Sequence, residues 1–322
     1  MNFQKNILKK IIIPKKYSGK RIDITLSYMF PNYSRSQLNY FLKKGEITIN
    51  NCNSKPSYKV LGGEIVYIKL NNINKDINDI HPENIALNII YEDNEILIIN
   101  KPNNLVVHPG AGNKKHTLLN ALLYYNKNFQ LLPRFGLLNR LDKNTTGLII
   151  IAKKIKSYFH LLNQMKNHNI KKYYLALVHG TLLSNGIINT FYGRNPKNRL
   201  KMSVLNNGKI ATTLFSVQKK YRYLTLVKIK LITGRTHQIR VHMSYINHPI
   251  IGDQLYGKKI CFSKKINQKL MNVLKNFKRQ ALHAYKLSFI HPSTQKILKF
   301  ISPLPEDFKF ILSELNKDII LK

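Results

Sequence analysis

The sequence predicts an α+β protein with a small α/β module over residues 18–70 and a larger domain over residues 87–316. The larger domain is expected to have a mixed, mainly antiparallel sheet flanked by helices. A chain of 322 residues, 43% of them hydrophobic, is long enough for two domains. Residues 71–86 are polar, rich in Asn and without apolar periodicity, which is typical of a linker. Beyond this linker, runs with strand character outnumber runs with helix character.

The small module is predicted to contain two helices followed by two strands. Apolar side chains recur at helical spacing in residues 21–29 and again in residues 35–43. Ser34 can cap the second helix, and Gly45 ends it where a left-handed residue is wanted. The two strands, separated by turn signals, are expected at residues 46–49 and 64–70.

Elements of the larger domain follow from the same periodicities. Helices are expected at residues 118–125, 157–165, 235–245 and 306–315. Strands are expected at residues 88–91, 95–100, 147–152, 173–179, 186–191, 211–218, 223–231, 281–290 and 297–301. The last helix carries two acids in its first turn, where they favour the positive end of the helix dipole.

The charge balance is strongly basic, with 53 Lys and Arg, 15 Asp and Glu, and a net charge of +38. Such a surface suits a polyanion, of which nucleic acid is the commonest. Part of the Lys excess fits a drift of codons towards A and T, because Ile and Asn are also over-used and Trp is absent. The Arg positions therefore carry more information than the Lys positions.

Cysteine usage and hydropathy argue against export and membrane insertion. Cys52 and Cys261 lie far apart, outside any metal-binding spacing, as expected of reduced thiols in a cytoplasmic protein. The apolar run at residues 11–13 is too short for a signal peptide. No apolar stretch reaches the roughly 18 residues that a membrane span needs. We therefore expect a cytoplasmic protein without a zinc site.

Asp142 is the only acidic residue between Glu95 and Asp253. It lies in a loop that runs from Arg140 to Gly147 and is surrounded in sequence by cations, which favour the charged form of a carboxylate. An ionised carboxylate suits nucleophilic or electrostatic work. A conventional glycosidase needs two carboxylates, and this long segment offers one.

A second cluster packs two Arg and two His into residues 235–242, at the start of an expected helix. Arg forks and the positive helix end could bind phosphate there. His237 and His242 are five residues apart, which is a poor spacing for one metal ion. Arg235 is also a candidate ion-pair partner for a buried Asp. The Gly-rich residues 105–113 match neither a phosphate-binding loop nor a dinucleotide fingerprint, and both a lid and an ordinary turn stay open.

The small module resembles an S4 RNA-binding domain. The resemblance is carried by residues 19–23, 33–37, 45–50 and 62–66. Its basic side chains would form a cationic face for a phosphate backbone, the alternative being a solvated charged helix pair. The residues concerned are Arg21, Arg35, Lys43 and Lys44.

The larger domain resembles the RluA family of RNA pseudouridine synthases. Residues 105–113, 139–147, 172–176 and 231–242 carry the resemblance, which extends over residues 19–315. The run at 106–113 favours the branch that acts on large-subunit (23S) ribosomal RNA. The resemblance implies isomerisation of specific uridines to pseudouridine by an Asp nucleophile with base flipping, without metal or cofactor.

The family assigns roles to matching positions. Asp142 would be the catalytic carboxylate, acting at C1′ or adding to the base, with both routes open. Tyr174 would stack on the base and help to remove the C5 proton, and Arg235 would pair with Asp142 and orient it. The expected substrate-side residues are Arg140, which would enter the RNA, Leu231 in the base pocket, and His237, Arg240 and Asn139.

One position departs from the family, since Asn139 stands where a His is usual. This departure motivates an alternative, a non-catalytic RNA-binding or ribosome-assembly factor with the same fold. A DNA-binding regulator is disfavoured, because neither a helix-turn-helix nor a zinc module is found. The expected partner is large-subunit ribosomal RNA, either free or in an assembling subunit. We expect a monomer without membrane association.

Overall fold

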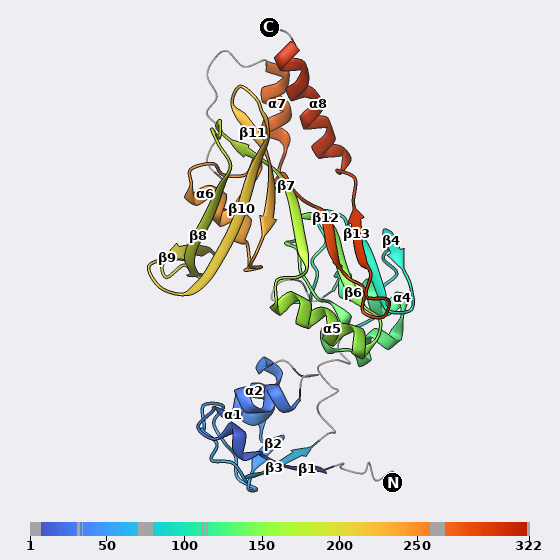
Figure 1. Ribbon diagram of the computed structural model, residues 1–322, viewed down its shortest axis with the longest axis vertical. Coiled ribbons are helices and arrows are strands. Elements are labelled where there is room, and N and C mark those ends of the chain that lie inside the picture. Colours follow the sequence, from blue (N-terminus) through green and yellow to red (C-terminus); the bar gives the residue numbers. More distant parts are fainter. Residues whose placement is uncertain are drawn as a thin grey trace. The chain divides into compact units, whose positions relative to one another are not determined.

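The computed structural model divides the chain into two compact units, Met1–Ile85 with Pro109–Gly136, and Ala86–His108 with Leu137–Lys322 (Figure 1). It describes residues 8–30, 33, 35–69, 80–110, 113, 115–257 and 268–320. The predicted cap Ser34, Cys261 and most of the predicted linker lie outside these residues. The predicted limits 18–70 and 87–316 stay a prediction, since compactness groups residues 109–136 with the N-terminal part.

The N-terminal unit confirms both predicted helices and both predicted strands. Its elements are β1 (Leu8–Ile12), η1 (Lys15–Tyr17), α1 (Ile22–Met29), α2 (Arg35–Lys44), β2 (Ile47–Ile49), β3 (Ile65–Lys69), α4 (Leu118–Tyr125), η3 (Lys127–Leu131) and η4 (Pro133–Gly136). β3 is the central strand of a three-stranded antiparallel sheet in the order β1-β3-β2. Apolar side chains of α1 and α2, among them Leu26 and Phe41, pack with this sheet in one core. Sequence reasoning missed β1, because its pairing with β3 is a long-range contact.

The second unit is built on a mixed sheet of ten strands, which confirms the predicted fold class. Its strands are β4 (Ile89–Glu92), β5 (Ile96–Lys101), β6 (Thr146–Ala152), β7 (Lys171–His179), β8 (Gly186–Arg194), β9 (Met202–Leu205), β10 (Lys209–Lys220), β11 (Leu224–Leu231), β12 (Leu282–Ile290) and β13 (Ile297–Ile301). The order is β4-β5-β6-β12-β7-β11-β10-β8-β9, with β13 paired to β12. Among the described strands only β6 and β12 pair in parallel.

The described residues of this unit include four helices: α5 (Ile155–Lys166), α6 (Gln238–Tyr245), α7 (Gln268–Asn276) and α8 (Glu306–Ile320). Figure 1 shows α7 and α8 side by side at one end of the unit, and α5 beside β6. β9 and α7 were not predicted. All four residues of β9 are only half-buried, so it lacks the alternation that reveals a strand. No helix within the described ranges is long and apolar enough to cross a membrane.

The predicted helix at residues 235–245 begins three residues later than expected, at Gln238. The side-chain carbonyl of Gln238 accepts hydrogen bonds from the Arg235 N–H (2.9 Å) and the Thr233 hydroxyl (2.8 Å). This turn, followed by a left-handed His237 with φ +56°, delays the helix. The shift matters because it moves Arg235 out of the helix and leaves Arg240 in its first turn.

β6 is buried along its whole length and starts directly after the Asp142 loop. At its start Gly147 has φ +115°, and a Cβ there would lie 2.4 Å from the Ala284 carbonyl oxygen. Only glycine therefore allows β6 to pair so closely with β12 at this point. This close pairing fixes the point at which the Asp142 loop joins β6.

Candidate active site

Asp142 lies in a tight turn that the Thr145 N–H closes by donating to the Asp142 carbonyl oxygen at 3.0 Å. Its side chain is 17% exposed. One carboxylate oxygen, Oδ2, accepts a hydrogen bond from Arg240 Nη1 at 2.9 Å. No side chain in the described ranges hydrogen-bonds to Oδ1, and the nearest cationic candidate, His237 Nε2, is 3.8 Å away. The carboxylate is thus anchored through one oxygen and accessible through the other.

Arg240 bridges two carboxylates. Its Nε and Nη2 donate to Asp253 Oδ2 at 2.7 Å and Oδ1 at 2.9 Å, and its Nη1 reaches Asp142. Burial opposes ionisation of Asp253, but the hydrogen bonds and charge of Arg240 outweigh it and lower the pKa of that carboxyl. Burial likewise lowers the pKa of Arg240, but the two carboxylates outweigh it and raise the pKa overall. The three side chains form a chain of charges that ends on Asp142.

The expected ion pair between Arg235 and Asp142 is wrong. The Arg235 side chain is exposed, and within the part of the chain that the structure describes it donates only long hydrogen bonds of 3.4 Å to the Ile210 carbonyl oxygen. Arg235 precedes the helix, whereas Arg240, expected only among the substrate-binding residues, lies on its first turn and takes the place beside Asp142. Asp253 was missed altogether, although as the next acid along an acid-poor chain it could have been recognised as a candidate.

His237 lies beside the Asp142 carboxylate. Its Nδ1 is 2.9 Å from the Tyr256 hydroxyl, and its Nε2 faces Asp142 Oδ1. Burial lowers the pKa of His237, although Asp142 acts in the opposite direction. A neutral imidazole therefore stands next to the accessible oxygen of Asp142 at neutral pH.

Tyr174 on β7 and Leu231 at the end of β11 are both buried and share one face of the sheet. Tyr174 stands opposite Ile229, and Leu231 follows two residues further along β11. Burial raises the pKa of the Tyr174 hydroxyl, and the negative charge of Asp142 raises it further. Tyr174 is therefore a neutral, protonated ring whose surroundings include Asp142.

Asn139 is bound to the protein backbone, whereas Arg140 is exposed. Asn139 Oδ1 accepts from the Ile150 N–H at 3.0 Å and its Nδ2 donates to the Leu148 carbonyl oxygen at 3.4 Å. The side chain that departs from the family pattern thus binds the backbone of β6 and not the carboxylate. Arg140 is exposed, two residues before Asp142.

The basic residues predicted for the small module lie on the N-terminal unit. Arg21 and Arg35 both donate to the buried carboxylate of Asp23, at 3.1 and 2.7 Å. Burial opposes ionisation of Asp23, but the two arginines outweigh it and lower its pKa. Lys43 and Lys44 are exposed at the end of α2. Two of the four predicted cations are therefore brought together by a shared acid that sequence reasoning overlooked.

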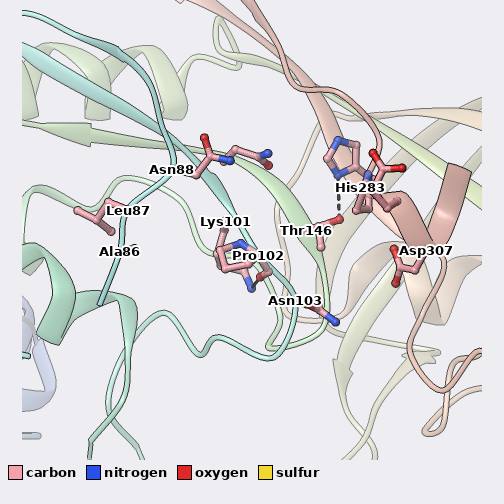
Figure 2. Close-up of a pocket in the computed structure, with 12 residues that line it drawn as sticks. Ala86, Leu87, Asn88, Lys101, Pro102, Asn103, Thr146, His283 and Asp307 are labelled. Atoms are coloured by element: carbon pink, nitrogen blue, oxygen red, sulfur yellow. Dashed lines mark hydrogen bonds between the residues drawn. The ribbon is translucent and has the colours of Figure 1, made fainter. Parts of the chain in front are cut away.

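Behind the Asp142 loop lies a pocket of about 660 Å³, with Lys101, Thr146, His283 and Asp307 in its lining (Figure 2). Lys101 is fully buried, and its Nζ donates to the carbonyl oxygens of Pro102 (2.7 Å), Leu105 (2.8 Å) and Lys143 (3.0 Å). Burial lowers the pKa of Lys101 to about 7, although Asp142 opposes this. No sequence signal distinguishes one buried lysine in so lysine-rich a chain.

Comparison with known proteins places the chain in a family. Residues 95–245, which include the Asp142 loop and α6, match the protein family described as RNA pseudouridylate synthase. The ribosomal large subunit pseudouridine synthase D of Blochmanniella floridana is 46% identical over 97% of this chain and 99% of its own length. The protein of the same name from Xylella fastidiosa (strain Temecula1 / ATCC 700964) is 40% identical over 96% of this chain and 93% of its own length.

Solved structures show the same relationship. Human RNA Pseudouridylate Synthase Domain Containing 4 superposes with a TM-score of 0.54 at 25% identity, covering 71% of this chain and 92% of that one. Human RNA Pseudouridylate Synthase Domain Containing 1 also gives a TM-score of 0.54 at 25% identity, over 68% of this chain and 84% of that one. The carboxylate that Arg240 holds thus lies in a recognised enzyme fold, and the chain belongs to the RNA pseudouridine synthase family.

Proposed function

We propose that this protein isomerises specific uridines of large-subunit ribosomal RNA to pseudouridine, with Asp142 as the catalytic carboxylate. The observation that carries the proposal is the geometry of Asp142, whose Oδ2 is held by Arg240 while Oδ1 is left for a substrate. The choice of RNA rests on the relatives, which are named ribosomal large subunit pseudouridine synthase D.

The reaction needs only one carboxylate. The N1–C1′ bond of uridine breaks, the same base is reattached through C5, the C5 proton leaves and N1 takes up a proton, so no water is consumed. Asp142 can attack C1′ or add to the base, and both routes require an ionised oxygen that faces the nucleotide. Arg240 holds the carboxylate by binding Oδ2, and Asp253 keeps Arg240 in place.

The base is proposed to meet Tyr174 after it leaves the RNA helix. A neutral aromatic ring offers a stacking surface to a uracil whose pairing has been lost. Leu231, on the same sheet face, would line the base pocket. Tyr174 would then help to remove the C5 proton, its hydroxyl oxygen accepting that proton while its own proton passes to solvent water.

Extruding a nucleotide costs a few kcal/mol of lost pairing and stacking. Arg140 is exposed and lies two residues from Asp142, so it is placed to enter the space that the base vacates. His237, whose Nε2 lies 3.8 Å from Asp142 Oδ1, would face the flipped nucleotide, whereas Arg240 would act on it through Asp142.

The N-terminal unit is proposed to act as an S4-like RNA-binding module. Arg21 and Arg35 are fixed side by side by Asp23, which suits two neighbouring phosphates. Lys43 and Lys44 would extend this cationic face. The proposal includes a cytoplasmic monomer that acts on ribosomal RNA, either free or in an assembling subunit.

Asp142→Asn tests the catalytic assignment. The amide has the same size but no negative charge, so pseudouridine formation should be abolished while the RNA dissociation constant changes by less than about twofold. Product is measured by nucleoside analysis and by release of labelled C5 hydrogen. Full activity of this variant would remove Asp142 from the mechanism.

Mapping pseudouridines in ribosomal RNA from cells with and without the gene tests the substrate. We expect specific large-subunit positions to lose their modification when the gene is absent. An unchanged map together with defective subunit assembly would instead support a non-catalytic assembly factor.

A further inference from the structure

Each residue of the segment 143–147, which follows Asp142, contacts a residue from elsewhere in the same unit. The contacts come from Lys101 and from the stretch 279–284, which leads into β12. They are Lys101 Nζ to the Lys143 carbonyl oxygen (3.0 Å), Arg279 Nη1 to the Asn144 carbonyl oxygen (3.3 Å), Gln280 Nε2 to Thr145 Oγ1 (3.0 Å), His283 Nδ1 with Thr146 Oγ1 (2.8 Å), and Ala284 against Gly147.

Arg279 is itself held in place by an acidic side chain of the C-terminal helix α8. Its guanidinium is buried, and its Nε and Nη2 donate to Asp307 Oδ2 at 2.6 Å and Oδ1 at 2.7 Å. A guanidinium is planar and rigid, so this two-point contact fixes the direction of the remaining nitrogen. That nitrogen, Nη1, donates to the Asn144 carbonyl oxygen and to the Gln280 carbonyl oxygen.

Asp307 belongs to the first turn of α8, where its Oδ1 also accepts a hydrogen bond from the Phe308 N–H at 2.8 Å. Burial opposes its ionisation, but the hydrogen bonds and charge of Arg279 outweigh it and lower the pKa of this carboxyl. The helix is anchored by buried Phe308, Ile311 and Leu315. Figure 2 shows Asp307 on the same side of the pocket as Thr146 and His283.

We propose that Asp307 and Arg279 are positioning residues for Asp142, through which the C-terminal helix α8 sets the place of the catalytic loop. The inference rests on the proposed function. Asp142 has one side-chain anchor, Arg240, so the direction of its free oxygen also depends on where residues 143–146 hold its backbone. A displacement of about 1 Å at a reacting group can reduce the rate by up to about 100-fold.

Asp307→Asn in the full chain tests the proposal, because it removes the charge from the pair and leaves the helix-capping oxygen. We expect kcat to fall about tenfold, with KM for RNA and the RNA dissociation constant within about twofold of wild type. Glu306→Gln is the matched control. Glu306 is the adjacent acid of the same turn, its side chain is 87% exposed, and its ion pair is with Lys309. Both variants lose one negative charge at the same end of α8, but of the two side chains only that of Asp307 binds Arg279.

Two further variants separate positioning from general stability. Arg279→Lys keeps the positive charge but loses the fork, so kcat should fall as in Asp307→Asn, and the double variant should lose little more. Asp307→Glu keeps the carboxylate and should recover most of the lost kcat. All rates are measured at a temperature at which thermal melting shows each variant to be folded.

The proposal is overturned if Asp307→Asn keeps wild-type kcat, if Glu306→Gln loses as much, or if only KM changes. It is also overturned if the effects of Arg279→Lys and Asp307→Asn multiply in the double variant. Failure of the proposed function looks different, because wild-type protein would then form no pseudouridine or Asp142→Asn would remain active.

Discussion

Replacing Asp253 with Asn should damage both stability and catalysis, because this residue holds Arg240, the side chain that binds Asp142. Asp253 has a fully buried side chain and binds Arg240 through both carboxylate oxygens. It also accepts hydrogen bonds from the Leu255 and Tyr256 N–H groups. An amide can keep one acceptor, but its NH₂ group faces a guanidinium donor and leaves a buried charge poorly paired.

The expected losses of stability and of kcat follow from these contacts. Breaking a buried charge pair by altering one partner costs about 3 to 5 kcal/mol. Arg240 keeps Asp142 as a partner, so we expect the lower end, about 3 kcal/mol, which corresponds to a fall in Tm of about 10 °C. Arg240 then turns towards the remaining carboxylate and shifts Asp142, so kcat should fall about 100-fold.

Release of labelled C5 hydrogen from RNA measures kcat, and thermal melting measures stability. Asp93→Asn is the control, because Asp93 accepts bonds from the Glu95 and Ile96 N–H groups and from Tyr91 at the β4–β5 turn. The Asp93→Asn variant should be less stable than wild type but have an unchanged kcat. If Asp253→Asn is folded under the assay conditions and turns over like wild type, the reasoning that links Asp253 to Asp142 is refuted.

Three further predictions concern pH, Asn139 and salt. Burial lowers the pKa values of His242 and His283 to about 4, whereas the unfolded chain takes up protons near pH 6.5. The free energy of unfolding should therefore fall as pH drops from about 6.5 to about 4, by about 3 kcal/mol per histidine. Urea unfolding at several pH values checks this, and replacing either His with Gln should flatten the dependence. Asn139→Ala should cost about 1 to 2 kcal/mol, because the Ile150 N–H loses its acceptor; a drop in kcat beyond about threefold would instead indicate contact with RNA. RNA affinity should fall steeply with salt, and Arg21→Gln should reduce the slope of log K against log salt by about 1; a flat dependence would contradict electrostatic capture.

Periodicity predicted most helices and strands, and it did so because their side chains are sorted by burial within a few residues. The helix at 118–125 and the strand at 297–301 were predicted with the limits that the structure has. The start of α6 was misplaced, because a side chain, Gln238, folds back on the preceding turn. β1 was missed because its partner β3 lies more than 50 residues away.

The sequence by itself determined the fold class and the family and made Asp142 the candidate catalytic residue, because a single acid in a long basic segment and four short motifs are local features of the chain. Only the tertiary structure decided which cation holds Asp142, because Arg235 and Arg240 are equally basic and differ in direction. The same holds for Asp253 and for the pair Arg279–Asp307, whose contacts cross 13 and 28 residues of chain. Hydrogen bonds between such distant residues depend on the packing of strands and helices, which no local pattern records.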